Sequence, residues 1–313
     1  MTRAATTASL VIQGGTIVSL EAEYRASIAV KDGLIHAIGA AKVMPPAPDT
    51  LNVTGLHMLP GAINIHVHFC DPGYPHKENF TSGTAAAAFG GVTTVLDMSN
   101  TLPTVATVEA LAAQHRIAVK KAFVDYGLYA VLGEDSLAHF DALVGGGLFG
   151  FKLYMGDTFG RIPSPTTRTM LQAFEIVAPT EKRISLHAET NSIMELRESR
   201  LRPEGRTEPL ALMTARPAVV AVEAGARAAI LAEWTGVRFH ILHISSAAEL
   251  WPLAGAKACG VDITGEACPH SLLLSSDDHG RSVHAIQVMP PARARNAAAM
   301  MASIPAGAAG TPS

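Results

Sequence analysis

The sequence predicts an α/β fold in which a TIM-type (β/α) barrel follows a small N-terminal β-sandwich. From residue 62 onward, seven apolar stretches rich in β-branched residues alternate with segments of helical pattern. Repeated strand–helix units of this kind form a parallel sheet. Seven such units in succession favour a barrel over an open sheet. The residues before them contain only short apolar runs and turns, which predict a separate all-β part.

The N-terminal part, residues 1–58, is expected to consist of short strands joined by tight turns. Apolar runs at 26–30 and 34–39 flank a turn that contains Asp32 and Gly33. An Asp-Gly pair between two apolar runs is a strong hairpin signal. No cluster of reactive side chains occurs here, so we interpret this part as a β-sandwich with no chemistry of its own.

The central part, residues 59–289, contains the predicted barrel. Its expected strands are 62–69, 92–98, 123–132, 149–155, 183–187, 238–244 and 261–266, and its clearest helices are 108–120, 167–177, 218–235 and 247–259. The remaining tail, residues 290–313, is rich in Ala and Gly and has room for one helix but no eighth strand. We therefore expect a barrel truncated before its last strand, with an open sheet edge.

Composition and charge exclude several kinds of partner. The net charge is −3 and there is no basic cluster, which argues against nucleic acid. No apolar run reaches the length of a membrane span, and the N-terminus lacks the pattern of a secretory signal. The 3 cysteines form no Cys-x-x-Cys pair, so neither a disulfide framework nor a structural zinc site is expected. These observations predict a cytoplasmic protein.

The first candidate for chemistry is the pair His66 and His68 at the end of the first barrel strand. Side chains of a strand alternate between its faces, so both imidazoles point the same way. They lie about 6–7 Å apart along the strand, close enough to bind one metal ion. On its own, such a pair is more often a structural feature of a half-buried strand. The metal hypothesis therefore requires ligands from other strands.

Later strands supply such candidates at their carboxyl ends, where (β/α) barrels place their functional residues. His187 ends the fifth predicted strand and His243 ends the sixth. His240 lies three residues before His243, so within one strand the two face opposite ways and only one can point inward. We favour His243 as the ligand because it is nearer the strand end, and we interpret His240 as a structural hydrogen-bonding residue.

Lys152 lies in the fourth strand between Phe151 and Leu153. One interpretation is a lysine whose amine reaches the surface along its aliphatic stem. The other is that burial lowers the pKa of the amine, so that its neutral form becomes accessible. A neutral amine can take up carbon dioxide to form a carbamate, whose two oxygens can bridge two cations. Four histidines and this carbamate would hold two zinc-type ions, which activate water as hydroxide for attack on an amide.

Six spaced motifs occur in one order along the chain. They are PGAINIHVHFCDPG (60–73), HKENFTSGTAAAAFGGVTTVLDMSNTLP (76–103), GFKLYMG (150–156), LHAE (186–189), RFHILHISS (238–246) and GEACPHSLLL (265–274). Together they resemble the cyclic amidohydrolases, the family that contains dihydroorotase, allantoinase and dihydropyrimidinase or hydantoinase. The resemblance implies a TIM barrel with a β-sandwich and a binuclear Zn²⁺ site. Its implied ligands are His66, His68, carbamylated Lys152, His187 and His243, and Asn100 is implied to contact the substrate.

Two departures from the family pattern affect the expected activity. Dihydroorotases usually carry Arg where Cys70 stands, and a thiol cannot hold a carboxylate bidentately; Cys70 is then either a pocket wall or a minor ligand. The family's last strand ends in S-D-H-x-P, whose Asp binds metal and acts as general acid/base, and this sequence contains no counterpart. The catalytic acid/base stays unassigned, and we expect activity lowered by at least ~10²-fold.

The resemblance leaves the substrate open within one chemical class. Residues 76–80 and 97–101 look like dihydroorotase, whereas 215–217, Glu223 and 266–270 look more like allantoinase. Both enzymes open a cyclic ureide at an amide C–N bond.

We predict a homo-oligomeric hydrolase of small cyclic amides, with Cys70, Asn100 and His270 at the substrate. The alternative is a non-catalytic scaffold or subunit partner with the same fold. Such relatives typically lose ligand histidines, whereas this sequence keeps all four, which favours the enzyme.

Overall fold

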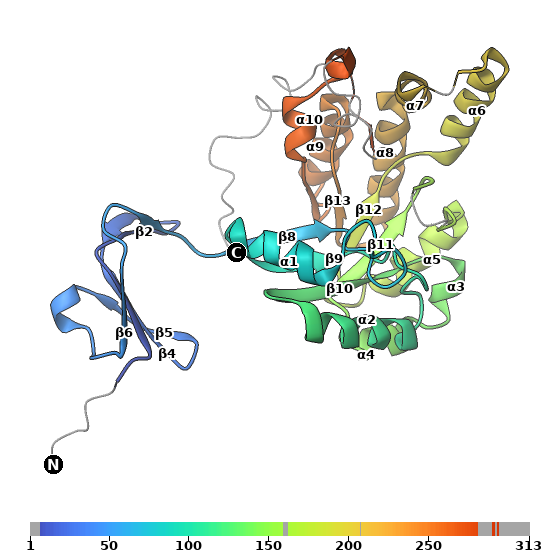
Figure 1. The fold of residues 1–313 in the computed structure, drawn as a ribbon. Helices are drawn as coiled ribbons and strands as arrows, with labels where there is room; N and C mark the ends of the chain where they lie inside the picture. The colour runs from blue at the N-terminus through green and yellow to red at the C-terminus, as the bar shows by residue number, and fades with distance from the viewer. Residues whose placement is uncertain (1–6, 159–161, 207, 281–289, 292, 294–313) are drawn as a thin grey trace. The chain divides into compact units, whose positions relative to one another are not determined.

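The computed structural model describes residues 7–158, 162–206, 208–280, 290–291 and 293 of the 313-residue chain (Figure 1). These residues divide into two compact units, one ending at Ala62 and one beginning at Ile63. Most of the predicted tail, residues 290–313, lies outside the described residues. No helix within the described ranges has the length and apolar character needed to cross a membrane.

The N-terminal unit contains two small sheets, with strand orders β5-β4-β1-β6 and β3-β2-β7. Its elements are β1 (Leu10–Gln13), β2 (Thr16–Val18), β3 (Glu23–Arg25), β4 (Ser27–Lys31), β5 (Leu34–Gly39), the 3₁₀ helix η1 (Ala41–Val43), β6 (Asp49–Asn52) and β7 (His57–Met58). The predicted hairpin is confirmed, because β4 and β5 pair antiparallel. Asp32 and Gly33 have φ of 52° and 76° at its turn, the left-handed conformation that a two-residue hairpin loop requires.

The second unit is built on a seven-stranded sheet, in the order β8 to β14 along the chain. Its strands are β8 (Ala62–Val67), β9 (Val92–Asp97), β10 (Asp125–Val131), β11 (Gly150–Tyr154), β12 (Ile184–His187), β13 (Phe239–Ile241) and β14 (Ile263–Gly265). The pairs from β9 through β14 are all parallel. The predicted succession of seven strands is therefore confirmed.

At least one helix follows each strand of this sheet, as the strand–helix pattern predicted. They are α1 (Phe80–Phe89), α2 (Val108–Lys121), α3 (Glu134–Leu137), α4 (Phe140–Gly145), α5 (Thr167–Val177), α6 (Asn191–Leu201), α7 (Pro209–Ala215), α8 (Ala218–Thr235), α9 (Leu250–Ala258) and α10 (Pro269–Leu273), with 3₁₀ turns η2 (Arg202–Glu204), η3 (Ala247–Glu249) and η4 (Ser276–Gly280). Thr107 and Thr166 cap the starts of α2 and α5 by accepting a backbone N–H, which satisfies an otherwise unpaired donor.

In the part of the chain that the structure describes, the sheet curls into part of a barrel, which confirms the predicted fold class (Figure 1). Within the described residues, β8 and β14 each pair with one neighbour only and form the two edges. Side chains from their carboxyl ends nevertheless meet, because His66 Nδ1 lies 2.5 Å from Glu266 Oε1. The curl therefore gathers the strand ends around one centre.

Strand alternation sorts the side chains of β11 between the core and the barrel interior. Phe151 and Leu153 belong to the large apolar core between sheet and helices, and the Phe151 ring stacks on Phe140 with centroids 5.2 Å apart. Lys152, between them, lines a cavity inside the barrel. The packing of its two neighbours thus fixes the direction in which the lysine points.

Candidate active site

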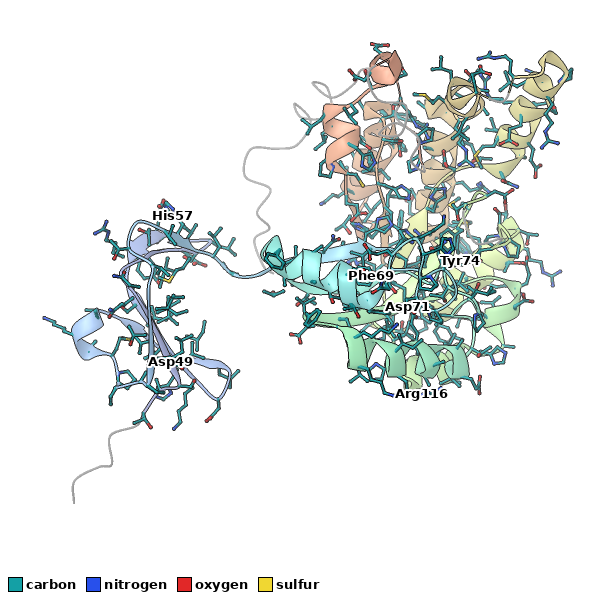
Figure 2. All side chains as sticks on the ribbon, in the orientation of Figure 1. Asp49, His57, Phe69, Asp71, Tyr74 and Arg116 are labelled. Atoms are coloured by element: carbon teal, nitrogen blue, oxygen red, sulfur yellow. The ribbon has the colours of Figure 1, made fainter. Side chains whose placement is uncertain are left out.

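A cavity of about 350 Å³ opens at the carboxyl ends of the strands. Its lining residues are His68, Cys70, Lys77, Glu78, Asn100, Lys152, Tyr154, Thr158, His187 and His243. Of the predicted site residues, only His66 and His270 are outside this lining. The loop after β8, which contains Phe69, Asp71 and Tyr74 (Figure 2), is tied to α2 by the Lys121–Asp71 ion pair at 2.8 Å.

The first histidine pair consists of His66 and His68 on and after β8. Their Nε2 atoms lie 3.1 Å apart, as the shared strand face predicts. The other ring nitrogen of His66, Nδ1, faces Glu266 at 2.5 Å. Because an ionised carboxylate only accepts hydrogen bonds, the His66 proton resides on Nδ1, and the Nε2 lone pair is directed at His68.

The second histidine pair consists of His187 and His243. His187 Nδ1 lies 3.0 Å from His243 Nε2, and His187 Nε2 donates to Glu189 at 3.0 Å. By the same reasoning, the Nδ1 lone pair of His187 is directed toward His243. Each pair therefore has one imidazole oriented by a carboxylate.

The four histidines are held in the neutral form. Burial lowers the pKa of His66 and of His187, and this effect outweighs their hydrogen bonds to glutamate. Burial, followed by the neighbouring histidine and Lys152 charges, lowers the pKa of His68 and of His243 still further. Neutral imidazole is the form that ligates metal.

The donor atoms fit two divalent cations. In a tetrahedral zinc site with Zn–N of about 2.0–2.1 Å, two ligand nitrogens lie about 3.3 Å apart, close to the separations of 3.1 and 3.0 Å in the two pairs. Within the described residues, no group of three or more His, Cys, Asp or Glu has the geometry of a metal site. Each pair would therefore need a third ligand of another kind, and Lys152 is the residue placed to supply it.

Lys152 is buried, with 1% of its surface exposed. Its Nζ lies 4.7 Å from the centre of the Tyr154 ring. Burial lowers the pKa of this amine to about 7, and the Glu266 charge opposes this effect. Near neutral pH a large fraction of the amine is consequently unprotonated, which is the form that reacts with carbon dioxide.

Asn100 and Tyr154 form a polar wall of the cavity. Asn100 follows β9 and is 3% exposed, and the Tyr154 hydroxyl donates to its Oδ1. Burial raises the pKa of Tyr154, so the hydroxyl keeps its proton and stays a donor. Both side chains could face a substrate carbonyl.

Two cavity residues adopt left-handed backbone conformations. Cys70 has φ of 57° and His243 has φ of 42°, which costs roughly 1–3 kcal/mol for a residue with a side chain. Burial raises the pKa of the Cys70 thiol, so it is a neutral part of the wall.

The prediction that His240 and His243 face opposite ways is wrong. Strand β13 ends at Ile241, and the left-handed turn at His243 redirects the chain, so both rings point inside the barrel and line different cavities. His240 is a structural hydrogen-bonding residue as predicted, with Nδ1 2.8 Å from Thr264 Oγ1. His270 lies half-buried on α10.

Two glutamates that the sequence analysis did not single out accept hydrogen bonds from the histidine pairs. Glu266 accepts from His66, and Glu189 accepts from His187, Arg216 and Arg293. Burial alone would raise the pKa of Glu189, but its hydrogen bonds and the two arginines lower it to about 2. The pKa of Glu266 is likewise lowered well below its usual range by His240 and His66 despite partial burial. Each glutamate lies inside a motif next to a ligand strand, but this local pattern does not reveal its partners.

A larger cavity, of about 850 Å³, lies at the other end of the strands. Its lining includes Phe149 and Arg183, which precede β11 and β12, together with Ser185 and His240. It contains none of the predicted metal ligands. The smaller cavity is therefore the candidate active site.

Comparison with known proteins agrees with this geometry. A family model described as "Dihydro-orotase-like" matches residues 55–249. The chain is 32% identical over 286 residues to an allantoinase of Deinococcus radiodurans, covering 91% of this chain and 64% of that protein. It is 34% identical over 288 residues to an allantoinase of Rubrobacter xylanophilus, covering 91% of this chain and 63% of that protein.

Among solved structures, the L-hydantoinase (dihydropyrimidinase) of Arthrobacter aurescens superimposes with a TM-score of 0.88 at 26% identity. The match covers 94% of this chain and 65% of the hydantoinase. The chain thus spans slightly less than two thirds of the length of these relatives.

The curled parallel sheet, with two oriented histidine pairs and a buried lysine at its carboxyl end, defines an amidohydrolase-type barrel. With the family match over residues 55–249, the chain belongs to the dihydroorotase-like family of cyclic amidohydrolases.

Proposed function

We propose that this protein is a metal-dependent hydrolase that opens an amide C–N bond of a cyclic ureide, with allantoin or hydantoin rings as its substrate class. The observation that carries the proposal is that His68, the His187–His243 pair and buried Lys152 line a single cavity, with His66 3.1 Å from His68. The names of the relatives, allantoinases and hydantoinases, support the choice of ring.

In this proposal His66 and His68 would hold one zinc ion, His187 and His243 would hold the other, and carbamylated Lys152 would supply a ligand to both. Two such cations would polarise the scissile carbonyl and lower the pKa of water toward neutrality. Recognition of the substrate ring would depend on side chains of the protein. Tyr154 and Asn100 present hydrogen-bonding groups to the ring, and Cys70 is a neutral wall beside it.

Metal analysis combined with a substrate panel tests the proposal. We expect about two equivalents of zinc-type metal per chain after loading, and hydrolysis of allantoin or hydantoin in preference to dihydrouracil and dihydroorotate. His243→Asn should lower both metal content and hydrolysis. His115→Asn, whose ring contacts Tyr126 outside the cavity, is the matched control and should change neither.

A folded protein that binds no metal and hydrolyses no member of the panel would contradict the proposal and favour a non-catalytic scaffold. Preferred hydrolysis of dihydroorotate would instead contradict the substrate class alone.

A further inference from the structure

Glu189 accepts hydrogen bonds from three buried side chains. Its Oε2 lies 3.0 Å from His187 Nε2 and 2.6 Å from Arg216 Nη1, and its Oε1 lies 2.9 Å from Arg293 Nη2. The carboxylate side chain is 1% exposed and each arginine side chain is 5% exposed. Both oxygens are thus occupied, and the side chain has no freedom to turn.

The two arginines reach Glu189 from separate segments. Arg216 follows α7 and also donates through Nη2 to the Asp157 carbonyl at 3.0 Å. Arg293 lies 104 positions beyond Glu189 and also donates through Nη1 to the Pro217 carbonyl at 2.8 Å. These backbone contacts fix each guanidinium independently of the carboxylate. Each guanidinium thus has an anchor besides the carboxylate, and both restrain the position of Glu189.

Burying two guanidinium groups around one carboxylate costs desolvation free energy. Within the described residues, the Nε atoms of Arg216 and Arg293 are buried without a hydrogen-bond partner, and desolvated charges of this kind are seldom kept for stability alone. The cluster nevertheless contacts one group of the candidate active site directly, the His187 ring. A role in orienting that ring would explain why two guanidinium groups are buried here.

The orientation follows from hydrogen-bond chemistry. A carboxylate that is already fixed by two arginines can only accept from His187, which places the imidazole proton on Nε2. The Nδ1 lone pair is then directed to the cavity, where it lies 3.0 Å from His243 Nε2. Without the fixed acceptor, the ring could carry its proton on either nitrogen.

We propose that Glu189 is a positioning residue, clamped by Arg216 and Arg293, which fixes His187 in the Nε2-protonated form with Nδ1 facing the metal site. The inference rests on the proposed function in treating His187 as a ligand. It goes further by assigning a role to residues that touch no metal or substrate.

The tautomer of His187 provides the first test. We would record long-range ¹H–¹⁵N correlations on the full, metal-free chain, assigning His187 by the loss of its signals in His187→Asn. The wild type should show the Nε2-protonated tautomer. The double variant Glu189→Gln/Arg293→Met keeps the net charge of the cluster and should show a mixture of tautomers. Arg183→Met, which breaks an arginine–aspartate pair at the opposite end of β12, should leave the tautomer unchanged.

Metal affinity provides the second test. Chelator competition should show ~10–100-fold weaker zinc binding for one of the two equivalents in the double variant, the usual consequence of losing an outer carboxylate. Arg293→Lys, which keeps the charge, should fall between the wild type and Arg293→Met. An Nε2-protonated His187 with wild-type zinc affinity in the double variant would overturn the inference, as would an Nδ1-protonated ring in the wild type.

These outcomes are separable from the proposed function, because the tautomer is measured without metal or substrate. If the double variant fails to fold, Arg293→Met alone retains the Arg216 contact and gives the same two measurements.

Discussion

The two histidine pairs of the candidate active site have the same internal design but different supports. In each, one ring donates to a glutamate and directs its other nitrogen at the partner histidine. Glu266 joins the two edge strands of the described sheet, and its side chain is 21% exposed. Glu189 follows an interior strand, and its side chain is 1% exposed.

This difference indicates that the two glutamates that orient the histidines contribute to the folding stability of the protein to different degrees. At the edge pair, Glu266 faces histidines and partial solvent, so the loss of its charge leaves no buried arginine behind. At the interior pair, the loss of Glu189 would leave two buried arginines without their carboxylate, a strongly destabilising change. The same Glu→Gln substitution should therefore have different consequences for folding.

Removing Lys152, the proposed ligand common to both pairs, should have the largest effect. Lys152→Met keeps the volume and apolar stem but removes the amine, so neither pair can gain a bridging ligand. We expect hydrolysis to fall by ~10³-fold or more, as for the loss of a dominant electrostatic contribution, with both metal equivalents weakened. Steady-state kinetics and metal analysis would measure this.

Lys182→Met is the matched control, because Lys182 donates to the Leu148 carbonyl at the other end of the sheet. A Lys152→Met protein that keeps its metal content and its rate of hydrolysis would contradict the proposal that Lys152 supplies a ligand to both pairs.

The contrast between interior and edge strands should also appear in global stability. Phe151 on β11 is fully buried, so Phe151→Ala should lower the free energy of unfolding by ~3–5 kcal/mol. Ile63 on β8 is 63% exposed, and Ile63→Ala should change it by only about 0.5 kcal/mol. Urea unfolding of both variants measures the difference. Equal losses would mean that β8 is as well packed as the interior strands.

Glu266→Gln should affect the edge pair alone. We expect ~10–100-fold weaker binding of one metal equivalent, with a midpoint of thermal unfolding close to that of the wild type. Asp262→Asn, at the start of the same strand and ion-paired to Arg183, is the control and should leave metal binding unchanged. A drop in unfolding temperature as large as that of Glu189→Gln would remove the distinction between the pairs.

The sequence was sufficient to predict the strands and most of the cavity. The number and order of the barrel strands followed from apolar runs with β-branched residues, a pattern set by burial of both faces of a parallel sheet. The placement of His68, Lys152 and His187 followed from alternation and from the rule that functional residues lie at strand ends.

The glutamates and arginines that orient the histidines could not be predicted in the same way. A glutamate beside a ligand strand looks like any solvent-exposed acid until its partners are known, and Arg293 meets Glu189 across 104 positions through tertiary packing alone. The inward turn of His243 depends on a left-handed backbone that begins after β13 has ended. Apolar periodicity carries no information on such a local turn.

The last effect concerns Lys152 in the metal-free chain, where it can be measured without metal bound to either histidine pair. Burial lowers the pKa of Lys152 to about 7 in the folded protein, whereas an unfolded lysine keeps its proton up to about pH 10.4. Between these values the unfolded state binds more protons, so Lys152 makes stability rise with pH. In carbon dioxide-free buffer, the unfolding free energy of the wild type relative to Lys152→Met should increase by up to about 1.4 kcal/mol per pH unit. Below about pH 7 this difference should be constant, because both states are protonated there. A constant difference across the whole range would mean that the amine stays charged at neutral pH, which would remove the chemical basis for a carbamate between the two pairs.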